Sequence, residues 1–77
     1  MIRRPFDLPA DAGRELIVDR LLCWAGHPSS ARDLIAAIYR KLPTVPPTEQ
    51  ARVIDACVRL GWQTAEGADR LRTELGH

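Results

Sequence analysis

The chain has 77 residues, of which 45% are hydrophobic, and its 11 basic and 10 acidic side chains leave a formal net charge of +1. This composition excludes an intrinsically disordered chain and a strongly basic protein that coats nucleic acid, and it indicates one compact domain with a small core. Residues 16–25 form the longest near-apolar run, but Asp19 and Arg20 interrupt it, so we expect no membrane span.

The sequence predicts an extended N-terminal arm at residues 1–10, followed by a single helical domain at residues 11–77. Two prolines disfavour a helix in the arm, whereas Phe6 and Leu8 can pack on the body. Acidic residues follow the basic start before any apolar run develops, so we expect no secretory signal. Two cysteines in such a chain favour a reducing compartment, and we therefore expect a cytoplasmic protein.

The first predicted helix begins after Asp11, whose carboxylate can cap it, and runs to about Ala25, just before Gly26. Its apolar side chains form a surface wider than one helix face: Ile17, Val18, Leu21, Trp24 and Ala25 in one stripe, flanked by Leu16, Leu22 and Cys23. Such a helix is either central in its own bundle or shared with a second subunit.

Ser30 and Asp33 have the spacing of a capping box, with a serine N-cap and an acidic residue three positions later, so they predict the start of a second helix. Pro43 ends that helix, because proline cannot continue one. The predicted apolar face holds Ala31, Leu34, Ile35, Ile38 and Leu42.

The third predicted helix opens at Pro47 or Thr48 and has two distinct sides. Its inner side holds Val53, Ile54, Cys57 and Leu60, and its outer side holds Thr48, Arg52, Asp55 and Arg59. Gly61 is placed to supply the left-handed residue that ends a helix, and Trp62 can then fold back over Cys57.

A fourth helix is predicted after Thr64, a suitable cap, with Ala68, Leu71 and Leu75 at spacings of three and four. Gly67 weakens it by roughly 1 kcal/mol relative to alanine. No segment alternates like a strand. The sequence therefore predicts an all-α, compact four-helix domain, helix-turn-helix-like in its second and third helices.

Catalytic and metal-binding functions are not favoured. The two histidines, His27 and His77, do not converge with a nucleophile, and no phosphate loop or paired-carboxylate motif is present. Cys23, His27 and Cys57 supply at most three ligands of a zinc site that needs four, and two core thiols with a capping histidine explain them better. We expect no enzymatic activity, no cofactor, no metal and no small-molecule substrate.

DNA binding is the leading functional hypothesis, because a polar helix on a small helical body is how helix-turn-helix proteins read DNA. In this hypothesis Thr48, Arg52 and Arg59 face phosphates or base edges, and Arg3 and Arg4 of the arm reach a minor groove. The simpler alternatives are an ion-pair ladder of Arg52, Asp55 and Arg59, and a flexible arm.

Three segments carry a resemblance that points the same way: 29–34 (SSARDL), 47–53 (PTEQARV) and 59–62 (RLGW). Together they resemble the C-terminal helical module of phage and plasmid primase-helicases of the virulence-associated E type. The resemblance implies a winged-helix-like module that assists DNA contact, with that role carried by Arg52 and Arg59. Two features differ: the connection before Thr48 is longer than a tight helix-turn-helix turn, and the part after Trp62 predicts a helix rather than a β wing.

The rival hypothesis is a regulatory protein-interaction module, of the kind a phage or mobile element encodes. The broad apolar surface of the first helix, with Leu16, Leu22 and Trp24, could form a homodimer or receive a partner helix. Burial of these residues within one subunit would remove that argument.

Overall fold

A computed structural model describes residues 5–76, and within that range the chain is all-helical with no strand. The elements are α1 (Arg14–Trp24), α2 (Ala31–Lys41), the short 3₁₀ helix η1 (Leu42–Thr44), α3 (Pro47–Arg59) and α4 (Ala65–Glu74). The predicted all-α, four-helix fold is confirmed. None of the described helices combines the length and the apolar character that a membrane crossing requires.

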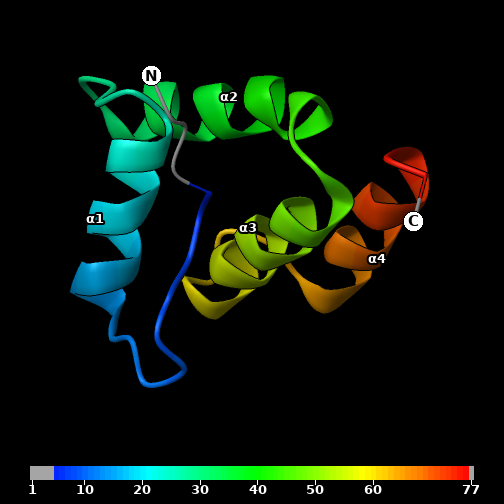
Figure 1. The fold of residues 1–77 in the computed structure, drawn as a ribbon, viewed down its shortest axis with the longest axis horizontal. Helices are drawn as coiled ribbons and strands as arrows, with labels where there is room; N and C mark the ends of the chain where they lie inside the picture. The colour runs from blue at the N-terminus through cyan, green and yellow to red at the C-terminus, as the bar shows by residue number, and fades with distance from the viewer. Residues whose placement is uncertain (1–4, 77) are drawn as a thin grey trace.

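Helix α3 lies between α1 and α4 in Figure 1 and contacts both, whereas α2 lies above it and contacts α1 and η1. Six residues of α3 are buried, including two polar ones, Glu49 and Gln50. The principal-axis extents of 29, 27 and 25 Å describe a nearly isometric body. The exposed residues of α3 are Pro47, Thr48, Arg52, Asp55 and Arg59.

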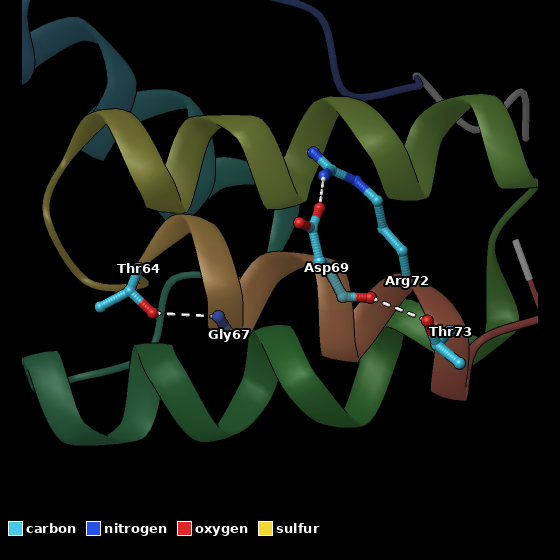
Figure 2. A network of polar contacts seen from close by, with 5 residues as sticks. All are labelled: Thr64, Gly67, Asp69, Arg72 and Thr73. Carbon is cyan, nitrogen blue, oxygen red and sulfur yellow. Dashed lines mark hydrogen bonds and ion pairs between the residues drawn. The ribbon is translucent and has the colours of Figure 1, made fainter.

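Most helix ends follow the predicted capping residues. Ser30 Oγ accepts a hydrogen bond from the backbone N–H of Asp33 at 3.1 Å, and Thr64 Oγ1 accepts one from Gly67 at 3.0 Å (Figure 2). Gly61 has a φ of +78°, the left-handed conformation predicted for it. The backbone N–H of Trp62 donates to the Cys57 carbonyl at 3.0 Å, and the Trp62 side chain packs partly buried against the core.

The predicted cap of the first helix is wrong. The N-cap of α1 is Gly13, and no side chain caps this helix. The Ala12 N–H donates to the Pro9 carbonyl at 3.1 Å, so Asp11 lies in a turn instead of at the helix start.

Three apolar-face assignments are also wrong. The side chain of Cys23 is exposed, although the sequence placed it in the core, Ile35 is 36% exposed, and Ala31 is exposed as well. All three residues lie at the edge of their helix's apolar arc, where the neighbouring elements decide burial. Cys57 is buried as predicted.

The described part of the arm before its turn, residues 5–9, is neither helix nor strand and packs on the body through Phe6, which is 3% exposed. The Phe6 ring stands edge-on to the indole of Trp24, with 6.1 Å between centroids and 76° between planes. The arm therefore contributes to the hydrophobic core.

Truncating Phe6 tests this contribution. We expect Phe6→Ala to lower the free energy of unfolding by about 3 kcal/mol, because it removes a buried aromatic ring and leaves a cavity. Asp7→Ala, on the exposed neighbour, should change it by less than about 0.5 kcal/mol. Urea unfolding followed by circular dichroism measures both, and equal effects would show that the arm does not belong to the core.

Candidate functional site

The outer side of α3 is exposed as the sequence predicts, with Thr48, Arg52, Asp55 and Arg59 along it. Arg59, however, is engaged within the molecule. Its Nη2 donates hydrogen bonds to the Ala10 carbonyl at 3.3 Å and to the Ala12 carbonyl at 2.8 Å. Arg59 therefore holds the chain just before α1 against the end of α3.

The alternative reading, an ion-pair ladder through Asp55, is not what the structure shows. No ion pair joins Asp55 to Arg52 or Arg59 among residues 5–76, whereas Arg72 and Asp69 of α4 do form one at 3.0 Å (Figure 2). Arg52 has no hydrogen-bond or ion-pair partner among these residues, so its guanidinium is available to a ligand.

Two further cations are also engaged with backbone carbonyls. Arg14 Nη1 donates to the Leu60 carbonyl at 3.0 Å, joining the start of α1 to the end of α3. Lys41 Nζ donates to the Trp24 carbonyl and lies 4.5 Å from the centroid of the Trp24 ring. Among residues 5–76, five exposed arginines remain outside such contacts, and they are spread over all four helices: Arg20, Arg32, Arg40, Arg52 and Arg70.

Arg3 and Arg4, the predicted minor-groove residues of the arm, lie outside the described residues. The structure brings Thr48 and Arg52 together on the first two turns of α3. No basic cluster accompanies this pair in the described part of α3, because Asp55 follows and Arg59 is engaged.

The predicted protein-interaction residues separate into two kinds. Trp24 is only 7% exposed, and its Nε1 donates to Glu49 Oε2 at 2.8 Å, so it belongs to the core. Leu16 and Leu22 are half-buried. Leu22 lines an apolar surface hollow, whereas Trp24 lines a separate cavity between the arm and α1.

That hollow is a groove of about 310 Å³ between the end of α1, the start of α2 and the segment after α3. Its walls are six apolar residues and two serines: Val18, Leu22, Pro28, Ala31, Leu34 and Trp62, with Ser29 and Ser30. No side chain in this set carries a formal charge. The groove is therefore suited to an apolar group.

An exposed apolar row continues from this groove along α2. Ile35 and Tyr39 are 36% and 37% exposed, and they follow Ala31 at successive intervals of four residues, which places all three on one side of the helix. Tyr39 Oη accepts a hydrogen bond from Gln63 Nε2 at 3.0 Å, and Gln63 directly follows the groove residue Trp62. We call the groove together with Ile35 and Tyr39 the α2 patch.

Sequence reasoning missed the α2 patch, because Ile35 was assigned to the core and Tyr39 was not considered. A signal was present: Ala31, Ile35 and Tyr39 form a row at the edge of the apolar arc of α2. Whether such an edge row is buried depends on the neighbouring helix, which the sequence does not specify.

A second cavity, of about 480 Å³, lies between the arm and α1 and includes the Cys23 thiol, Arg20 and Asp19. No group of three His, Cys, Asp or Glu side chains able to hold a metal ion occurs among the described residues. Burial raises the pKa of the Cys57 thiol to about 11, so this thiol stays protonated near neutral pH.

Comparison of the chain with protein-family models, curated proteins and solved structures finds no match. The resemblance to primase-helicase modules thus depends on the sequence pattern alone.

The two outer arginines of α3 should differ in their effect on stability. Arg59→Ala should lower the free energy of unfolding by about 1 kcal/mol, because two backbone carbonyls lose a charged donor. Arg52→Ala, the matched change two turns earlier, should stay within about 0.5 kcal/mol of the wild type. Denaturant titration distinguishes them, and equal values would contradict the role of Arg59 as an anchor.

Proposed function

We propose that this protein is a non-enzymatic protein-interaction module that binds its partner through the α2 patch. The observation that supports this proposal is an uncharged apolar groove continuous with the two large exposed hydrophobic residues of α2, Ile35 and Tyr39. Exposed apolar surface that gathers in one place, and is joined to a hollow, is typical of a docking surface.

The chemistry of the α2 patch suits a partner that inserts an apolar side chain. Binding energy at protein interfaces is concentrated in a few aromatic or aliphatic anchors that fill desolvated pockets. Trp62 and Leu22 provide apolar walls for such an anchor, and Tyr39 offers an aromatic ring beside it. The patch has no charged side chain whose burial would have to be compensated.

DNA contact by the start of α3 is the second candidate. It is supported by the exposure of Thr48 and Arg52 on the first two turns, since the N-terminal residues of a recognition helix contact base edges. The resemblance to primase-helicase modules points to the same helix. We rank this function second because Arg59 is engaged with the arm and the net charge is only +1.

The docking proposal predicts a position-dependent photocrosslink in the cells that produce the protein. The photoreactive residue p-benzoylphenylalanine at position 35 should crosslink to a protein partner, whereas the same residue at exposed position 70 on α4 should not. Adding Tyr39→Ala should reduce the crosslink from position 35 severalfold, because it removes part of the patch. Equal crosslinking from positions 35 and 70 would rule out the α2 patch as the docking surface.

The DNA candidate predicts salt-sensitive binding to a labelled duplex. At about 50 mM salt the wild type should bind at micromolar concentration and weaken as salt rises. Arg52→Ala should weaken binding by about 1–3 kcal/mol, whereas Arg70→Ala should leave it unchanged. Absence of binding by the wild type at that salt concentration would eliminate this candidate.

A further inference from the structure

We propose that the partner at the α2 patch is a second copy of this chain, with the two α2 helices antiparallel about a two-fold axis at Ile35. This inference rests on the proposed docking function and names its occupant. The resulting dimer is isologous, so both copies use the same surface.

The positions of the hollow and the protruding row suggest this pairing. Ala31 lines the groove, and Tyr39 lies two turns further along the same side of α2, at a helical rise of about 12 Å. A two-fold axis that places Tyr39 of one copy over the groove of the other necessarily repeats the contact in reverse. Ile35 is midway between positions 31 and 39, so it meets its own counterpart at the axis.

The charges of the patch favour a copy of the same surface over a charged partner. The α2 patch contains no Asp, Glu, Lys, Arg or His side chain, so an acidic segment or a nucleic acid would gain no electrostatic attraction from it. Arg32 is the nearest charge on this side of α2. In the antiparallel arrangement the two Arg32 residues are six positions apart along the helix axis, about 9 Å, and do not oppose each other.

The orientation of Tyr39 also fits this arrangement. Its hydroxyl accepts a hydrogen bond from Gln63 of the same copy, and the residue is still 37% exposed. In the proposed dimer this exposed part of Tyr39 contacts the other copy's groove. An aromatic side chain that is already fixed loses little conformational entropy on association.

The expected dimer is weak. A standard interface covers about 800 Å² of each partner, which is about 15% of the 5276 Å² surface of this chain. The proposed contact consists of one helix of 11 residues with an adjoining groove, so we expect it to cover less than that area. We therefore expect dissociation at micromolar concentrations, with a mass rising from 8.6 kDa toward twice that value.

Sedimentation equilibrium across a concentration series tests the proposal. The wild type should dimerise, Tyr39→Glu should raise the dissociation constant at least about tenfold, and Arg70→Glu on α4 should not change it. Circular dichroism must show the same helicity for all three proteins, which is expected because both substituted residues are exposed. A wild type that stays monomeric, or a dimer that Tyr39→Glu leaves intact, would overturn the proposal.

A disulfide trap tests the position of the axis. In a Cys23→Ser background, which removes the exposed thiol, Ile35→Cys should form a linked dimer on mild oxidation, because residues at the axis come within the roughly 4 Å between Cβ atoms that a disulfide needs. Arg70→Cys should not. Equal linking of both variants would contradict the two-fold arrangement.

The photocrosslink separates this inference from the proposed function. A product of twice the chain mass from position 35 supports the second copy. A product with a different protein overturns the second copy and leaves docking at the α2 patch in place. If position 35 gives no more crosslinked product than position 70, both the second copy and docking at the α2 patch are ruled out.

Discussion

The indole of Trp24 is the contact on which the arrangement of this small domain depends. Phe6 of the arm packs edge-on against the ring, and Glu49 of α3 accepts a hydrogen bond from the indole N–H. Lys41 at the end of α2 lies over the ring and donates to the backbone carbonyl of Trp24. One side chain of α1 thereby joins the arm and two other helices. A domain of this size buries only about 60% of the surface that its unfolded chain exposes, so its core is small. A side chain that joins several elements is therefore especially important to its stability.

Side chains that hold the fold together are not available for binding, and this determines which surfaces remain for function. Arg14, Lys41 and Arg59 each donate a hydrogen bond to a backbone carbonyl near a helix end or a turn. These side chains stabilise the fold and are therefore not available to bind a ligand. The Trp24 side chain is buried and engaged in the same way. What remains outside these contacts is a surface whose acidic and basic residues nearly balance, with a net charge of +1, and an apolar patch along α2. This is why protein docking ranks above DNA contact.

Local chemistry made much of the fold predictable from the sequence. Ser30, Thr64 and Gly61 act through their own backbone neighbours, so their roles as caps and helix stop are readable without tertiary information. Arg52 and Arg59 were not separable in this way, since they lie two turns apart on one helix face. The carbonyls that bind Arg59 are at least 47 residues away in sequence, and only the folded path of the arm brings them there.

Gly67 shows how a local weakness can serve a distant surface. A Cβ atom there would lie 1.9 Å from Oε1 of Gln63, so a larger residue would displace that carboxamide. In its present position the carboxamide accepts from the Thr64 N–H through its oxygen and donates to Tyr39 through its nitrogen. The glycine that costs α4 roughly 1 kcal/mol of propensity thus leaves room for the group that orients Tyr39. An aromatic ring fixed in this way is preorganised for contact, which is the property that a docking surface on so small a domain most needs.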